Sequence, residues 1–216
     1  MIFQDRLDAG DKLGQALQKL NLKGVVILGI PRGGVIVAKG VAKALNAPLD
    51  VIIPRKIGAP HNPEVAIGAV TQDGTVIKDE ALVHLLGITD DEIEAMAKHV
   101  SGEISRRVNT YRGGRPGLKL MGKTVVVVDD GIATGFTVQA ALKSVRGMKP
   151  RRLILAVPVA PSEIIKSLQV QVDDLVCLDS PELFYAVGQF YVDFDQTTDE
   201  EVIELLAEYG KAGVTN

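Results

Sequence analysis

The chain has 216 residues, of which 46% are hydrophobic, enough to bury one substantial core, and no linker-like segment divides it, so we expect a single domain over residues 1–216. A formal net charge of −3 leaves no electrostatic footprint for nucleic acid, and no apolar run is long enough to span a membrane. The single cysteine, Cys177, excludes an internal disulfide, and without a signal-peptide pattern we expect a cytoplasmic protein.

Residues 25–45 predict the first strand-turn-helix unit. An apolar run over 25–30 is typical of a buried strand, and a helical pattern follows the turn Pro31-Arg32-Gly33-Gly34. This turn matches neither the dinucleotide-binding pattern GxGxxG nor a Walker motif. A helix that starts after this turn presents unpaired backbone amides, which can bind an anion. The alternative is that Arg32 is solvated and the glycines only let the helix pack closely.

Residues 51–70 begin as a strand and run into two adjacent cations, Arg55 and Lys56. The rest of the segment contains too much proline and glycine for a helix, so we expect a mobile, irregular loop. A cationic loop between strands suits a lid that closes over a polyanion and excludes water, whereas an exposed cation pair is also ordinary protein surface. His61 and Glu64 lie in the same segment and are candidates for proton transfer.

Two elements are expected between this loop and the middle of the chain. Asp73-Gly74 is a hairpin signal, and it predicts that residues 66–70 and 75–78 pair as antiparallel strands. Thr89 to Glu92 forms a capping box, and apolar residues at helical spacing predict a long scaffold helix after it. That apolar stripe consists of Ile93, Met96, Val100, Ile104 and Val108.

Residues 125–137 are the most informative part of the sequence. Four consecutive valines predict a strand buried on both faces of a parallel sheet, and a helical pattern starts near Gly135. Asp129 and Asp130 stand at the carboxyl end of that strand, where they can accept hydrogen bonds from sugar hydroxyls. Unpaired amides at the helix start bind phosphate. The segment therefore predicts a phosphorylated-sugar site, the alternative being an ordinary Asp-Asp-Gly turn.

The C-terminal third predicts two more strands, over residues 152–161 and 174–179, and two helices, from about Ser162 and over 198–208. Proline cannot donate to a ladder of hydrogen bonds, so Pro158 favours an edge position or a strand terminus. Five of the nine Phe and Tyr residues of the chain lie within 184–194. Flat rings can stack on a heterocycle, and the alternative is that they pack together as a small core. The candidates for stacking are Phe184, Tyr185, Phe190 and Tyr191.

The acidic pair followed by Gly-x-x-Thr-Gly-x-Thr resembles the phosphoribosyl pyrophosphate (PRPP) motif of the type I phosphoribosyltransferases. The Pro-Arg-Gly-Gly and Asp-Asp-Gly-Ile-Ala-Thr-Gly signatures are also similar to those of a bacterial group of uncharacterised phosphoribosyltransferase-like proteins. The resemblance implies an α/β fold, with a parallel sheet, flanking helices and a small hood. The core would cover about residues 22–180, and the hood about 1–20 and 180–197.

The resemblance also implies roles for individual residues. Asp129 and Asp130 would bind the ribose hydroxyls, and Arg32, Arg55 and Lys56 would meet the charge of pyrophosphate, these five being the expected catalytic residues. The pyrophosphate-binding turn would be Pro31, Arg32, Gly33 and Gly34. The 5-phosphate would be bound by Gly131, Ile132, Ala133, Thr134, Gly135 and Thr137. The aromatic residues of the hood would face the acceptor.

The implied activity is transfer of ribose 5-phosphate from PRPP to a nitrogen acceptor of the nucleobase kind, with release of pyrophosphate. Mg²⁺ is expected as a cofactor bound mainly through PRPP, with no direct protein ligand. The expected partners are PRPP and an unidentified acceptor, without membrane or nucleic acid, and the family resemblance allows a homodimer. The alternative is a PRPP-sensing regulator that has the same fold and no transferase activity.

Overall fold

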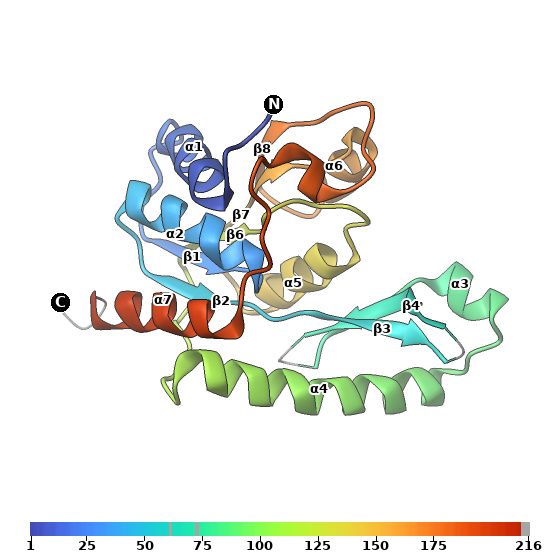
Figure 1. Ribbon diagram of the computed structural model, residues 1–216. Coiled ribbons are helices and arrows are strands. Elements are labelled where there is room, and N and C mark those ends of the chain that lie inside the picture. Colours follow the sequence, from blue (N-terminus) through green and yellow to red (C-terminus); the bar gives the residue numbers. More distant parts are fainter. Residues whose placement is uncertain (61, 72–73, 213–216) are drawn as a thin grey trace.

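A five-stranded parallel sheet forms the body of the protein, in a computed structural model that describes residues 1–60, 62–71 and 74–212 (Figure 1). The strand order is β2-β1-β6-β7-β8. The strands are β1 (Val25–Gly29), β2 (Leu49–Val51), β6 (Thr124–Val128), β7 (Arg152–Val159) and β8 (Asp174–Asp179). This arrangement confirms the predicted α/β class and parallel sheet.

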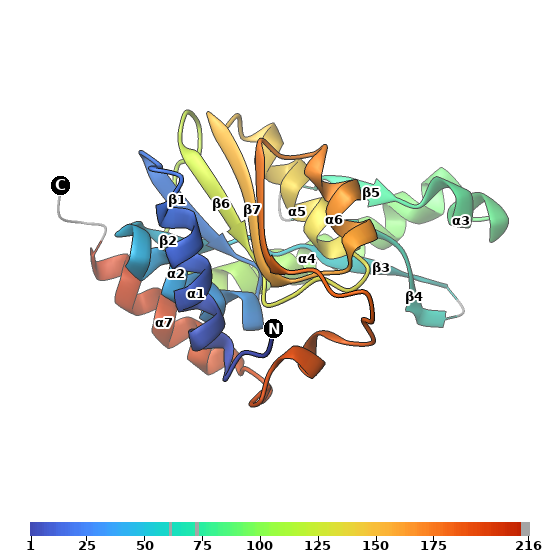
Figure 2. The same cartoon turned by 90° about the horizontal axis from the view of Figure 1, so that it is seen from above.

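Helices cover both faces of this sheet, which Figure 2 shows from above. They are α1 (Arg6–Gln18), α2 (Gly33–Leu45) and α7 (Asp199–Ala212) on one face, and α5 (Phe136–Gly147) and α6 (Ser162–Gln169) on the other. The valine run explains why both faces need cover: Val126 and Val128 pack toward α1 and α2, whereas Val125 and Val127 pack toward α5 and α6. Within the described residues, no helix combines the length and apolarity needed to cross a membrane.

An arm projects from this body and carries a second, antiparallel sheet with two helices (Figure 1). Its elements are β3 (Arg55–Ala59), β4 (Asn62–Val70), β5 (Val76–Lys78), α3 (Glu80–Leu85) and α4 (Asp90–Arg112). The predicted pairing across Asp73-Gly74 is confirmed, since Val70 lies opposite Val76. The capping box is also confirmed, because the Thr89 hydroxyl accepts from Glu92 N while the Glu92 carboxylate accepts from Thr89 N.

The prediction of an irregular loop after Arg55 is wrong, because this segment forms the β3–β4 hairpin. Its glycines serve the sheet: the register shifts at Gly58, as in a β-bulge, and a Cβ on Gly68 would lie 2.4 Å from the carbonyl oxygen of Ile77. Ile57 and Ile67 are buried in the same core as α4. His61 lies outside the described residues, and the backbone of Glu64 belongs to β4.

The expected edge position of Pro158 is also wrong, since β7 pairs with β6 on one side and β8 on the other. The alternative expectation of a strand terminus is confirmed, because Pro158 is the penultimate residue of β7. Near a strand end the missing amide costs few ladder hydrogen bonds. The predicted helices from Ser162 and around 198–208 are present as α6 and α7.

The N-terminal segment contacts the segment between β8 and α7. Phe3 N donates to the carbonyl oxygen of Phe190 at 2.8 Å, and Val192 N donates to that of Phe3 at 2.9 Å. The segment between β8 and α7 includes one short 3₁₀ helix, η1 (Val187–Phe190). The contact builds a small separate core, here called the hood core, of Phe3, Ala9, Val159, Phe190 and Tyr191.

Candidate active site

The two turns singled out in the sequence touch one another at the carboxyl ends of neighbouring strands β1 and β6. A Cβ on Gly33 would lie 1.9 Å from Asp130 Oδ2, and a Cβ on Gly34 would lie 2.9 Å from Asp129 Cα. Asp129 and Asp130 are called the acid pair below. Only glycine fits where the 31–34 turn crosses this pair. Ligands of open parallel sheets bind at this end of the strands.

The acid pair is largely shielded from solvent. Asp130 N donates to Asp129 Oδ1 at 2.9 Å, which fixes one carboxylate against the backbone of the other residue. Burial raises the pKa of Asp129 well above its usual range, and the neighbouring Asp130 raises it further. Burial also raises the pKa of Asp130, against the opposing pull of Arg6. Two crowded carboxylates at a strand end are poised to accept hydroxyl hydrogen bonds or to attract cationic charge.

Arg6, from the first turn of α1, is the direct partner of Asp130. Its Nε donates to Asp130 Oδ2 at 2.7 Å, with only 12% and 17% of the two side chains exposed. From the hood core, Tyr191 OH donates to the carbonyl oxygen of Asp130 at 2.5 Å. Both the N-terminal helix and the segment after β8 thus fix the position of Asp130. Neither contact was predicted, because neither residue belongs to a recognisable motif.

The 131–137 turn leads from the acid pair into α5. Gly135 precedes the helix with φ of +82°, a conformation that favours glycine, and provides no side-chain cap. The backbone amides of the first turn of α5 therefore have no side-chain cap. Ala133 and Thr134, just before the helix, are exposed. An uncapped helix start with exposed residues in front of it is suited to bind an anion.

Arg32 stands at the start of α2, after a cis Pro31–Arg32 peptide bond. Its Nη1 lies 3.7 Å from Asp199 Oδ1 of α7. Asp199 Oδ1 also accepts hydrogen bonds from Arg107 Nη2 at 3.0 Å and from Tyr111 OH at 2.6 Å. Both partners are nearer to Asp199 than Arg32 is. The pKa of Asp199 is lowered chiefly by the Tyr111 hydrogen bond, so this carboxylate is a stable anion beside the site. The role of Asp199 was also missed in the sequence.

A pocket of about 310 Å³, here called the arginine pocket, opens beside the acid pair. It is lined by Arg6, Arg32, Gly33, Phe194, Gln196 and Thr197. Two of its lining residues are cations from different elements, and the others come from the 31–34 turn and the segment before α7. A pocket of this composition favours a compact anion.

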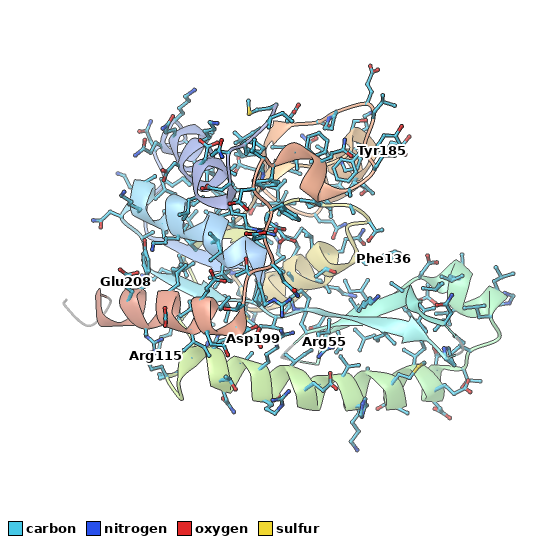
Figure 3. All side chains as sticks on the ribbon, viewed as in Figure 1. Arg55, Arg115, Phe136, Tyr185, Asp199 and Glu208 are labelled. Carbon is cyan, nitrogen blue, oxygen red and sulfur yellow. The ribbon has the colours of Figure 1, made fainter. Side chains whose placement is uncertain are left out.

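Arg55 and Lys56 lie at the start of β3, where the arm joins the body of the protein. Arg55 Nη1 pairs with Glu103 Oε2 of α4 at 2.5 Å, while Lys56 is exposed. Figure 3 shows Arg55 between the ribbons of α4 and the sheet. The structure therefore does not place Arg55 in contact with the acid pair or with the 31–34 turn.

The four aromatic candidates separate into two environments. Phe190 and Tyr191 are 6% and 7% exposed in the hood core, and the Phe184 ring packs on Phe190 with centroids 5.3 Å apart. Tyr185 is 84% exposed and is not part of the hood core. The alternative of a small aromatic core thus describes three of the four rings, and Tyr185 is the one with a free face.

The site offers few protein atoms to a metal ion. Within the described residues, no group of three or more His, Cys, Asp or Glu side chains is arranged to hold a metal ion. The carboxylates of the acid pair are hard oxygen donors, which suit Mg²⁺ when a polyphosphate supplies the remaining ligands.

A family model, two curated relatives and a crystal structure all resemble this chain over most of its length. The family model for the phosphoribosyl transferase domain matches residues 4–195. Two proteins from strains of Mycobacterium tuberculosis, provisionally named phosphoribosyl transferases, are each 44% identical over 205 residues, which are 95% of this chain and 46% of theirs. The chain thus spans about half the length of these curated relatives. The crystal structure of TT1426 from Thermus thermophilus superposes with a TM-score of 0.85 at 42% identity, covering 97% of this chain and 99% of that one.

Proposed function

The chain belongs to the phosphoribosyl transferase domain family, and on this premise we propose that it transfers ribose 5-phosphate from PRPP to a nitrogen acceptor of the nucleobase kind, releasing pyrophosphate. The observation that carries this proposal is the contact of Gly33 with Asp130, where a Cβ would lie 1.9 Å from the carboxylate. This contact places the cationic 31–34 turn against the acid pair, and the acid pair in turn leads into the uncapped start of α5. These are the three kinds of group that a phosphorylated, pyrophosphorylated ribose requires.

In this proposal each part of PRPP has its own protein surface. Asp129 and Asp130 accept hydrogen bonds from the ribose hydroxyls, and the amides and hydroxyls of the 131–137 turn bind the 5-phosphate. The 31–34 turn with Arg32 binds the pyrophosphate. We further propose that residues 1–216 act as one domain, with a core over about 22–180 and a hood of about 1–20 and 180–197 facing the acceptor, where Tyr185 offers an exposed ring.

The proposed chemistry is mainly electrostatic. The bond between ribose C1 and the pyrophosphate oxygen breaks with its electron pair leaving on pyrophosphate, and the lone pair of the acceptor nitrogen forms the new bond to C1. The acceptor nitrogen then gives up its proton to water. Arg32 stabilises the negative charge of the leaving group, and the acid pair orients the ribose. Mg²⁺ bound with PRPP would supply further neutralisation of the same charge.

Calorimetric titration tests this proposal directly. We expect the protein to bind PRPP, to bind it more tightly with Mg²⁺, and to bind ribose 5-phosphate more weakly than PRPP, because the pyrophosphate group and the metal add contacts that ribose 5-phosphate lacks. Absence of PRPP binding under both conditions would refute the donor site. PRPP binding without pyrophosphate release for any base tested would instead support the PRPP-sensing regulator.

We further propose that the arm closes over PRPP and that Arg55 then leaves Glu103 to contact the pyrophosphate. Substitution of either residue gives a second test. Changing Glu103→Gln removes this competitor and is expected to tighten PRPP binding by about 1.5- to 5-fold, the range for a partly exposed ion pair. Arg55→Gln is expected to weaken it about tenfold. Glu94→Gln, an exposed change on the same helix, is the control and should not alter PRPP affinity. If Arg55→Gln binds PRPP like the wild type, Arg55 has no part in binding the donor.

A further inference from the structure

Arg6 is the cation most firmly held at the candidate site, although it lies far from both motifs in the sequence. Three contacts orient its guanidinium: Nε donates to Asp130 Oδ2 at 2.7 Å, Nη1 donates to the carbonyl oxygen of Asp195 at 2.7 Å, and the group stacks over the Phe194 ring at 3.8 Å from its centroid. Together they fix both the position and the plane of the guanidinium. An arginine held in this way loses little further entropy when it binds a ligand.

The part of Arg6 that remains available faces a pocket. Among the described residues Nη2 has no hydrogen-bond partner, and Arg6 lines the arginine pocket together with Arg32 and Gly33. Arg32 has only a long contact of 3.7 Å to Asp199. Asp199 keeps Arg107 and Tyr111 as partners when Arg32 turns away, so recruiting Arg32 leaves no carboxylate unpaired.

The positive charges that line the arginine pocket favour an anionic ligand. Arg6 balances Asp130, and Arg32 adds a further positive charge on the same pocket, whose remaining lining residues are uncharged. The planar guanidinium groups suit the paired oxygens of a phosphate, which they can bind through two parallel hydrogen bonds. The pocket therefore fits a compact anion with several charged oxygens, next to the carboxylate that would hold a sugar hydroxyl.

We propose that Arg6 is a further binding residue of the donor site, one that contacts the pyrophosphate group together with Arg32 while its Nε holds Asp130 in place for the ribose. This inference rests on the proposed function, since it assigns pyrophosphate to the arginine pocket. It also gives the N-terminal helix a direct part in donor binding. Without ligand, the same arginine serves as the counterion of the acid pair.

Titration of inorganic pyrophosphate into the wild type and into Arg6→Gln tests the inference. The variant is expected to bind pyrophosphate about 10- to 100-fold more weakly, as after loss of a charge-assisted hydrogen bond. Lys12→Gln removes the same charge from the same helix, where Lys12 pairs with Asp8, and is the matched control with unchanged pyrophosphate affinity. Arg6→Lys, which keeps the charge without the planar fork, should recover part of the affinity.

A double-mutant cycle separates direct contact from simple neutralisation of Asp130. In an Asp130→Asn background, Arg6→Gln should still weaken pyrophosphate binding about tenfold if Arg6 touches the anion. If the effect disappears in that background, Arg6 acts only as a counterion and the inference is overturned. It is also overturned if Arg6→Gln binds pyrophosphate within about twofold of the wild type, or if the wild type does not bind pyrophosphate.

The inference and the proposed function can fail separately. If the wild type binds pyrophosphate but not PRPP, and Arg6→Gln loses the pyrophosphate, the assignment of Arg6 stands while the donor site is refuted. If PRPP binds with Mg²⁺ but Arg6→Gln is unaffected for both ligands, the donor site stands and the role of Arg6 is refuted. Thermal denaturation of each variant identifies any that loses binding because it has unfolded, and Arg6→Lys then decides the case.

Discussion

Replacing Asp129 and Asp130 together with asparagine is expected to weaken PRPP binding by about 10²- to 10⁴-fold, the largest loss of affinity that we predict for this protein. Each carboxylate would accept hydrogen bonds from a ribose hydroxyl, and a hydrogen bond to a charged group contributes about 1.5–3 kcal/mol. Asparagine keeps the volume of the side chain but loses the charge that draws hydroxyl donors and the Mg²⁺-bound ligand. Calorimetric titration with Mg²⁺-PRPP measures the change.

The control for this variant removes two charges elsewhere. Asp11 on α1 and Asp91 on α4 are both exposed, and changing both to asparagine should leave PRPP affinity within about twofold of the wild type. The single variant Asp129→Asn provides a folding control, because it leaves the Arg6–Asp130 ion pair intact. PRPP binding by the Asp129→Asn, Asp130→Asn variant at wild-type strength would refute the assignment of the acid pair.

The acid pair lowers the stability of the folded protein when its carboxylates are ionised. The folded-state pKa of Asp129 lies above the ordinary value of 3.8, so the folded protein binds more protons than the unfolded chain in the pH range between them. The contribution of Asp129 to stability therefore falls as pH rises through that range, and the ionised carboxylate is destabilising at neutral pH. A ligand that donates hydrogen bonds to this pair, or brings a cation, offsets that cost.

Gly33→Ala is expected to lower the proposed transferase activity by about 100-fold or more. The added Cβ would lie 1.9 Å from Asp130 Oδ2 and 2.5 Å from Arg6 Nε, so the methyl group must separate the ion pair or push the 31–34 turn away from the acid pair. Displacing binding groups by about 1 Å can reduce a rate by about 10²-fold. Initial rates of pyrophosphate release, measured once an acceptor base has been identified, and PRPP titration both report the change.

A matched glycine substitution shows whether the effect is specific to the site. Gly102 lies inside α4, and a Cβ added there would meet no atom within 4 Å. Gly102→Ala should keep full PRPP affinity and raise the free energy of unfolding by about 0.5–1 kcal/mol, because alanine favours a helix. Equal PRPP affinity in Gly33→Ala and the wild type would show that the crossing of the two turns is not needed for binding.

The strands of the parallel sheet, the two central turns and the helices α2, α4, α5, α6 and α7 were predictable because their signals are local. A valine run, a capping box or a glycine-rich turn is stabilised largely by residues close in the sequence, and β6, α4 and the 131–137 turn follow these signals closely. The β3–β4 hairpin was missed because glycines that permit close strand approach resemble those that form loops. Gly68 is the example, since its space is filled by the backbone of another strand.

The parts of the site that sequence could not provide depend on contacts between distant segments. Arg6 lies 124 residues from Asp130, and nothing in the pattern of α1 distinguishes it from any exposed arginine. Asp199 is equally ordinary as an acidic residue in the first turn of a helix, where acids are common. Only the folded arrangement shows that one arginine partners the acid pair and that the aspartate lies beside Arg32.

The contacts of Asp130 with Arg6 and Tyr191 also have a consequence for the order of events during synthesis. Tyr191 follows Asp130 by 61 residues, so a growing chain can form β1 and β6 before the hood segment has left the ribosome. Until then Phe3 lacks Tyr191, the residue with which it pairs in the hood core. A chain that stops before residue 190 therefore contains the 31–34 and 131–137 turns but lacks the hydroxyl that donates to the carbonyl oxygen of Asp130 and the residues that pair with Phe3. The contacts that hold Asp130 and Phe3 from the hood segment therefore form only after both turns have been synthesised.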